Sequence, residues 1–388
     1  MIRRNLIYLR GAYGPGNFGD DLLMISMLNF LRTLVEDEKI TVSIENPEFI
    51  SNNYKKIKSS PINAPVFSKI AILGGGGQFF SFKGNKYKQL NTPFLRRLLS
   101  LLKVGYSIMD LFLGFILRKT YGLGYKARNY SWFCVGFGPF YSDFTSERLK
   151  MIASNKANLI SVRDEKSSIV MEEQVGVIPD VFSDISFSSQ YWLSDSIYKI
   201  KKLPSKDSRK RIGVVIREWG FSSSGLNLVD KLLKFTKDHN EYDYVYILLD
   251  KRKDESLIEK YKLKDCLVWD INKYSISDFC VLLKENIDLI ISSRAHGVLV
   301  PTICHIPCIS LEIEPKLKAV HDLLPNATWL ISENNFSDLK NKIEFILSIP
   351  KVELNDIFIR DLSMNLQKSE ESFSKLKNWI KNILGNEA

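Results

Sequence analysis

Short apolar runs of strand character alternate along this chain with longer amphipathic or glycine-rich segments. In the N-terminal half these runs are Leu6 to Leu9, Ile70 to Leu73, Trp132 to Val135 and Leu159 to Val162. Short continuous apolar runs separated by helical patterns are typical of buried parallel strands whose connections are helices. The alternation therefore predicts an α/β fold built on parallel sheets.

A polar and basic stretch between Ser194 and Arg211 interrupts the alternation, as exposed linkers between domains commonly do. Beyond it the pattern restarts, with expected strands at 212–216, 244–249 and 287–291 and expected helices at 227–239 and 276–285. We therefore expect three parts, which are an N-terminal α/β domain over residues 1–200, a C-terminal α/β domain over 205–355 and a C-terminal helix over 356–388.

The segment 93–121 departs from this plan and is expected to form a helical insertion. Residues 98–117 are mostly apolar and are flanked by basic side chains, but Lys103 and Asp110 interrupt the run. Each such charge near the centre of a bilayer costs about 2.5 to 3.5 kcal/mol on insertion scales, so the segment is not expected to span a membrane. Two interpretations stay open, interfacial docking on an anionic membrane surface and a packed helical hairpin.

The charge and the cysteine content narrow the partners and the compartment. The formal net charge of +10 favours anionic partners such as phosphorylated substrates or a membrane surface. Neither zinc-finger spacing nor an aromatic RNA-binding motif accompanies that charge, so nucleic acid is not expected as a partner. The five cysteines are scattered and give no disulfide framework, which fits a reducing cytoplasm.

Neither a metal site nor a secretion signal is expected. Cys304 and Cys308 lie on an apolar run and are predicted to be core residues rather than metal ligands. The first apolar run, Leu6 to Leu9, is too short for the apolar region of a signal peptide. We therefore expect a cytoplasmic protein, peripheral at the inner face of the cell membrane where the segment 93–121 docks on lipid.

The strongest candidate for chemistry is the run from Ile287 to Gly297. The expected strand at 287–291 delivers Arg294 and His296 to the point where an apolar helix is expected to start near Val298. A strand end that faces a helix N-terminus favours anions, because unpaired N–H groups and the helix dipole both attract negative charge. Arg294 adds a planar fork for carboxylate or phosphate, and His296 adds a group that transfers protons near neutral pH. A purely structural interpretation, in which both side chains only cap the helix, stays open.

Further glycine-rich and charged motifs precede this run in order. They are Gly11 to Asp21, Gly74 to Gly77, Gly136 to Pro139 and Ser161 to Asp164. With the Ser-x-Arg-x-His run that ends at His296 as the last member, the ordered set resembles the polysaccharide pyruvyl transferase family. The resemblance spans roughly Leu6 to Lys316 and so covers most of the chain.

The resemblance implies both a fold and a reaction. The implied fold has two Rossmann-like domains that face a cleft, in a glycosyltransferase-B-like arrangement. The implied reaction transfers pyruvyl from phosphoenolpyruvate to two hydroxyls of a sugar, forms a cyclic ketal and releases phosphate. The acceptor would belong to a polysaccharide or a lipid-linked precursor in the assembly of surface glycans such as capsule or exopolysaccharide. Phosphoenolpyruvate is then a co-substrate, and no further cofactor is expected.

That reaction assigns roles to the C-terminal motif. Protonation of the methylene carbon of the enol requires an acid, for which we expect His296 because the ordinary pKa of histidine lies near neutrality. The donor carries a carboxylate and a phosphate, and one arginine cannot bind both in a bidentate manner. We therefore expect Arg294 with its neighbour Ser293, and Arg217 at the end of the strand at 212–216, to bind the donor.

Arg163, in the run Ser161 to Asp164, is a further candidate for donor binding. For both Arg163 and Arg217 a structural interpretation stays open. Arg163 could form only an ion pair with the adjacent Asp164, and Arg217 could pair at the surface with the adjacent Glu218.

The glycine-rich loop near the N-terminus is expected on the acceptor side. Glycines let the backbone approach a ligand closely, and Gly16 and Gly19 flank Asn17 just before Asp20. We expect these residues to bind the acceptor, with Asp20 as a base for a sugar hydroxyl. The alternative is that Asp20 only caps a helix.

Gly75 and Gly76 lie in a turn after the strand at 70–73 and are also expected to contact the acceptor, with close packing as the alternative. No Gly-Lys-Ser/Thr follows this turn, which disfavours a nucleoside triphosphatase. The turn also lacks the third glycine of a dinucleotide-binding fingerprint.

Two other functions stay open. A nucleotide-sugar-dependent glycosyltransferase would use the same architecture and also place an arginine near phosphate. A noncatalytic glycan- or anion-binding subunit would bind its ligand without turnover, and that binding would survive the loss of His296.

Overall fold

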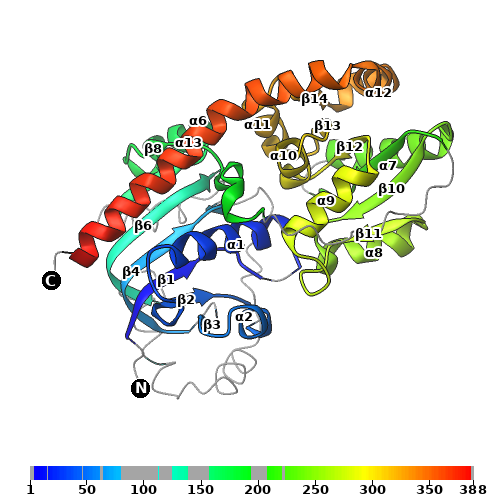
Figure 1. Ribbon diagram of the computed structural model, residues 1–388. Coiled ribbons are helices and arrows are strands. Elements are labelled where there is room, and N and C mark those ends of the chain that lie inside the picture. The colour runs from blue at the N-terminus through cyan, green and yellow to red at the C-terminus, as the bar shows by residue number, and fades with distance from the viewer. Residues whose placement is uncertain are drawn as a thin grey trace. The chain divides into compact units, whose positions relative to one another are not determined.

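The computed structural model describes residues 4–14, 16–45, 47–61, 64–79, 112, 125–138, 157–193, 208–220 and 223–385 (Figure 1). The chain divides into two compact units. The first unit comprises residues 1–15, 23–185 and 368–388, and the second comprises residues 16–22 and 186–367.

The first unit is built on a parallel sheet. In the described part the strand order is β3-β2-β1-β4-β6-β7-β8, with β5 paired to β6. The strands are β1 (Arg4–Arg10), β2 (Ile40–Ser43), β3 (Lys58–Ser60), β4 (Val66–Gly74), β5 (Gly77–Phe79), β6 (Tyr125–Phe137), β7 (Ala157–Val162) and β8 (Asp180–Val181). The helices are α1 (Phe18–Arg32), which begins in the second unit, α2 (Glu48–Asn53), α6 (Glu165–Val175) and the C-terminal part of α13 (Lys351–Gly385).

Different helices cover the two faces of this sheet. Phe133 of β6 packs on Phe373 of α13 with ring centroids 5.3 Å apart, and Phe30 of α1 packs on the same ring at 4.8 Å. The adjacent Trp132 belongs instead to an apolar cluster with Met171 of α6. Successive strand residues point to opposite faces, so α1 and the end of α13 lie on one face (Figure 1) and α6 lies on the other.

The second unit holds another parallel sheet, with the order β11-β10-β9-β12-β13-β14. Counted along the chain within this unit, that order is the 3-2-1-4-5-6 arrangement of a Rossmann fold. The strands are β9 (Arg211–Val215), β10 (Asp243–Leu248), β11 (Cys266–Val268), β12 (Leu289–Ser292), β13 (Cys308–Leu311) and β14 (Thr328–Ile331). The helices are α7 (Ser223–Asp238), α8 (Lys251–Tyr261), α9 (Ile276–Asn286), α10 (Ala295–Ile303), α11 (Pro315–Leu323), α12 (Leu339–Ser348) and the first part of α13.

The predicted α/β class with parallel sheets is confirmed, and the expected strands and helices of both halves are present. The helix expected near Val298 begins earlier, at Ala295. The hydroxyl of Ser292 accepts the N–H of Arg294 at 3.1 Å and donates to its carbonyl at 2.9 Å, which turns the chain sharply into the helix. His296 therefore lies in the first helical turn.

The units also differ from the predicted domains in three places. The second unit begins at Ser186, whereas the N-terminal domain was predicted to extend to residue 200. Residues 16–22 belong to the second unit because the backbone of this loop bonds to the end of β10. Phe18 donates its N–H to the carbonyl of Leu249 at 2.8 Å, and Lys251 donates to the carbonyl of Gly16 at 3.0 Å. The C-terminal helix starts at Lys351, and its residues are divided between the units after residue 367.

Two predictions fall outside the described residues. They concern the helical insertion at 93–121, of which only Phe112 is described, and most of the linker, at residues 194–207. Within the described ranges, every helix is too short or too polar to cross a membrane.

Asp361 of α13 forms hydrogen bonds with the segment that precedes β14. Its carboxylate accepts the backbone N–H groups of Asn326 at 2.7 Å and Ala327 at 2.9 Å, and also the side-chain amide of Asn326 at 2.7 Å. We expect Asp361→Ala to lower the free energy of unfolding by about 3 kcal/mol, because the buried N–H of Ala327 and two part-buried donors of Asn326 lose their acceptor. Asp356→Ala, at an exposed position of the same helix, should change it by less than about 0.5 kcal/mol. Denaturant unfolding of both variants measures the difference, and equal small effects would contradict the assignment.

Candidate active site

The centre of the second sheet is a topological switch point. β9 pairs with β12, and the chain leaves these two neighbours toward opposite edges of the sheet. In open α/β sheets, ligands bind beyond the carboxyl ends of the strands at such a point. The charged residues that follow the strands here are Arg217 after β9, Asp250 after β10, Arg294 after β12 and Glu314 after β13.

Ser293 ties the two central strands together. Its N–H and its hydroxyl both donate to the carbonyl of Val215, each at 3.0 Å, and its hydroxyl oxygen accepts the N–H of Arg217 at 2.7 Å. Ser293 is 1% exposed. The hydroxyl expected to bind the donor is therefore engaged in holding Arg217 beside the end of β12.

The guanidinium of Arg217 is held on two sides. Its Nη1 donates to Oε1 of Glu314 at 2.8 Å, and its Cζ lies 4.6 Å from the centroid of the Trp219 ring. The side chain of Arg217 is 28% exposed, whereas that of Glu314 is only 2% exposed. The surface partner that the sequence suggested, Glu218, instead accepts hydrogen bonds from Lys260 and Tyr261.

Arg294 is more deeply buried and is already bound. Its Nη2 donates to both carboxylate oxygens of Asp254, at 2.5 and 2.7 Å, and the two side chains are 9% and 2% exposed. Burial raises the pKa of Asp254, and Arg294 opposes that shift. The predicted donor ligand Arg294 is thus paired with a buried carboxylate in this structure.

His296 packs against the backbone of the N-terminal glycine-rich loop. A Cβ atom added to Gly19 would lie 2.7 Å from Cγ and 3.0 Å from Cε1 of the imidazole, and closer still to Nδ1. Real Cβ contacts are not that short, so only glycine at position 19 leaves room for the ring as it stands. The loop and the first turn of α10 therefore fix the histidine together.

The loop is itself ordered by Asn17 and Asp21. Asn17, directly before α1, accepts the N–H of Gly19 at 3.2 Å. Asn17 therefore caps this helix, which was the alternative role left open for Asp20. Oδ2 of Asp21 accepts the N–H of Gly16 at 2.9 Å and the indole N–H of Trp269 at 2.8 Å.

Two adjacent carboxyl groups of this loop have raised pKa values. Burial is the main cause for Asp20, whose pKa rises to about 6, with Lys253 opposing and Asp250 reinforcing the shift. Burial likewise raises the pKa of Asp21 to about 8. Asp20 keeps partial exposure, whereas Asp21 is fully buried. Asp20 therefore has the properties of a proton acceptor that works near neutral pH.

The remaining predicted site residues lie in the first unit. Arg163 bonds to Asp184 at 3.0 Å and lies 3.5 Å from Asp164, so its contacts are those of the structural ion pair left open above. Gly75 and Gly76 have φ angles of 65° and 75°, which L side chains rarely adopt. Their turn thus requires glycine for backbone reasons alone.

Sequence reasoning missed the acidic partners of the arginines, which are Asp254 and Glu314, and the buried Asp250. Both oxygens of Asp250 are buried and accept no hydrogen bond from any described residue, and Nζ of Lys253 lies 3.3 Å away. One sequence feature could have indicated two of them, because Asp250 and Glu314 each closely follow a strand of the same sheet.

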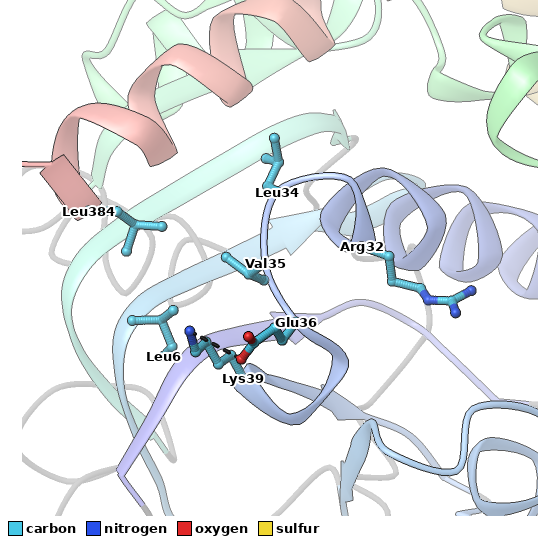
Figure 2. Close-up of a pocket in the computed structure, with 7 residues that line it drawn as sticks. All are labelled: Leu6, Arg32, Leu34, Val35, Glu36, Lys39 and Leu384. Atoms are coloured by element: carbon cyan, nitrogen blue, oxygen red, sulfur yellow. Dashed lines mark ion pairs between the residues drawn. The ribbon is translucent and has the colours of Figure 1, made fainter.

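No cluster of three or more His, Cys, Asp or Glu side chains within the described ranges could hold a metal ion. A pocket of about 610 Å³ lies in the first unit and contains none of the predicted site residues (Figure 2). The cations that line it are paired, Arg32 with Asp37 at 2.9 Å and Lys39 with Glu36 at 3.3 Å. The switch point of the second unit remains the candidate active site.

Solved structures share this architecture. A glycosyltransferase from Rickettsia africae is 14% identical with a TM-score of 0.50, and 98% of this chain and 99% of that chain are covered. Staphylococcus aureus MnaA, solved with UDP, is 9% identical with a TM-score of 0.54 over 98% and 97% of the chains. A UDP-GlcNAc 2-epimerase from Methanocaldococcus jannaschii is 11% identical with a TM-score of 0.51 over 90% and 94%. At these identities the likeness concerns the fold alone, and it confirms the glycosyltransferase-B-like class.

The fold and the arginine and histidine side chains at its switch point are compatible with several enzyme classes, so the family decides among them. The family model of polysaccharide pyruvyl transferases matches residues 17–315. The chain therefore belongs to the polysaccharide pyruvyl transferase family, as its motifs suggested, and is a transferase. A search of curated protein sequences found no match.

The contact between Gly19 and His296 gives a direct test of the site. We expect Gly19→Ala to displace the imidazole and to lower the turnover of pyruvyl transfer by about 100-fold, because small misplacements of reacting groups have effects of this size. The matched control is Gly220→Ala, where an added Cβ meets no atom within 4 Å. Steady-state kinetics and thermal unfolding of both variants separate a site effect from a folding effect. Wild-type turnover in a folded Gly19→Ala enzyme would contradict the assignment.

The raised pKa of Asp21 predicts a pH-dependent stability. Because the folded state holds this proton more tightly than the unfolded chain, stability falls as pH rises from about 4 toward the folded-state pKa of about 8. Asp21→Asn cannot ionise, and its amide oxygen can still accept the bonds from Gly16 and Trp269. We expect its free energy of unfolding, measured with denaturant at pH 4.5, 6 and 8, to fall less across this window than that of the wild type. Parallel pH profiles would contradict the prediction.

Proposed function

We propose that this enzyme transfers the pyruvyl group of phosphoenolpyruvate to two hydroxyls of one sugar, forming a cyclic ketal and releasing phosphate. Two new C–O bonds form at the enol carbon of the donor, and its bond to the phosphate oxygen breaks. Of the two hydroxyl protons lost by the sugar, the methyl group of the ketal gains the equivalent of one and the phosphate gains the other.

The observation that carries the proposal is the set of groups at the switch point of the second unit. A partly exposed arginine, Arg217, follows one central strand, and His296 lies in the first turn of the helix that follows its neighbour. Asp20, with a pKa raised by burial to about 6, belongs to the same unit. This chemistry requires a group that binds an anion, a proton donor and a proton acceptor. The family membership supports pyruvyl as the group transferred.

His296 would protonate the methylene carbon of the donor. This step converts the enol carbon to an oxocarbenium-like centre that the first sugar hydroxyl attacks. An imidazole suits the step because histidine exchanges protons near neutral pH. The packing of the ring against Gly19 would hold the acid in one position while the donor is bound.

Arg217 would bind an anionic group of the donor, and Asp20 would take a proton from the attacking hydroxyl. Among the described residues, the guanidinium of Arg217 donates a hydrogen bond only to Glu314, so it retains N–H groups for a ligand. Loss of the phosphate and attack of the second hydroxyl then close the ketal. We propose that the acceptor is a hexose unit of a polysaccharide or of its lipid-linked precursor.

Phosphate release separates this function from sugar transfer. We expect wild-type enzyme to release phosphate from phosphoenolpyruvate only when an acceptor is present. His296→Asn should lower that rate by about 100- to 10,000-fold while it retains donor binding, because it removes only the acid. Arg217→Ala should weaken the binding of phosphoenolpyruvate, measured by calorimetry.

The same calorimetry with nucleotide sugars provides the contrary outcome. Tight binding of a nucleotide sugar, without binding of phosphoenolpyruvate, would contradict the proposal and favour a glycosyltransferase. Full turnover by a folded His296→Asn variant would contradict the acid role alone.

A further inference from the structure

The two arginines at the switch point differ in how open they are to a ligand. Arg294 and its partner Asp254 are 9% and 2% exposed, so a solvent anion has little access to that pair. Arg217 is 28% exposed, although its partner Glu314 is only 2% exposed. An anion that binds Arg217 therefore binds an arginine that is already paired with the buried carboxylate of Glu314.

Glu314 is buried at the start of α11. It is the N-cap residue of α11, with an extended backbone conformation (φ −145°, ψ 155°), directly before Pro315. The Glu314 side chain is 2% exposed and lies 2.8 Å from Nη1 of Arg217, so its negative charge lies beside any ligand of that guanidinium. A second anion on Arg217 would thus lie within several ångströms of a buried negative charge, and in a partly buried site such repulsion is only weakly screened.

The guanidinium of Arg217 nevertheless keeps N–H groups for a further hydrogen bond. A guanidinium carries five N–H groups, and among the described residues this one donates a side-chain hydrogen bond only to Glu314. The Trp219 ring, 4.6 Å from Cζ, and the bond from the Arg217 N–H to Ser293 keep it in place. The site is therefore built to admit an anion while it opposes tight binding.

We propose that Glu314 is a positioning residue of the donor site, whose buried negative charge limits the affinity of anions for Arg217. It holds the guanidinium in position, and it keeps the released phosphate from remaining bound. The identity of the donor rests on the function proposed above, but the effect of Glu314 on anion binding does not.

Inorganic phosphate is the probe for this inference, with affinity measured by calorimetry on the full chain. Glu314→Gln keeps the size of the side chain and removes its charge, so we expect phosphate to bind about three- to tenfold more tightly. Glu312→Gln removes the same charge two positions earlier on the same segment, at a partly exposed site, and should leave the affinity unchanged. Arg217→Ala should lose phosphate binding.

A merely structural role for Glu314 predicts the opposite sign, because freeing Arg217 from its partner would weaken phosphate binding. Unchanged or weaker binding by Glu314→Gln would therefore overturn the inference. Glu314→Ser supplies a second uncharged variant, with a residue type that favours the N-cap position, in case the glutamine variant does not fold. Its phosphate affinity should rise in the same way.

Turnover with phosphoenolpyruvate separates this inference from the proposed function. If removal of the Glu314 charge tightens phosphate binding but phosphoenolpyruvate is not consumed, the proposed function fails and the inference stands. If phosphoenolpyruvate is consumed but neither uncharged variant binds phosphate more tightly, the inference fails and the function stands. In an active Glu314→Gln enzyme, phosphate should inhibit at a lower concentration than in the wild type.

Discussion

The parallel pairing of β9 with β12 is the constraint on which the candidate site depends. Val215 and Ser292 lie opposite each other in the register, so the carboxyl ends of β9 and β12 lie side by side. The strand order reverses between these two neighbours, which is where ligands bind in open α/β sheets. Arg217 and Ser293 meet there through a hydrogen bond of 2.7 Å, and His296 follows in the first helical turn.

Burial then determines which charged side chains can lie beyond the carboxyl ends of these strands. An unpaired guanidinium in a dry site costs several kcal/mol, so each arginine has an acidic partner. Asp254 neutralises the buried Arg294, whereas Glu314 leaves the partly exposed Arg217 open to a further ligand. The same desolvation raises the pKa of Asp20 to about 6, which suits a base near neutral pH. Differences in burial thus distinguish the enclosed Arg294, the partly exposed Arg217 and the carboxyl of Asp20 with its raised pKa.

The strands and the arginines of the site could be predicted from local sequence, but the acidic partners of the arginines could not. Apolar runs that end in Arg217 or Arg294 mark strand ends because burial demands such runs. The partners Glu314 and Asp254 lie 97 and 40 residues from their arginines along the chain, so only the completed fold brings them together. Contact between Gly19 and His296 is equally long-range, and the loop was assigned to the other half for that reason.

The most direct test of the account is turnover of the wild-type enzyme in D₂O with phosphoenolpyruvate and a panel of hexosides. If an acid of the site protonates the methylene carbon, each ketal should carry one deuterium in its pyruvyl methyl group, and one phosphate should appear per ketal. Mass spectrometry of the product and a phosphate assay measure both. Transfer without deuterium in the methyl group, or turnover only with a nucleotide sugar, would contradict the account.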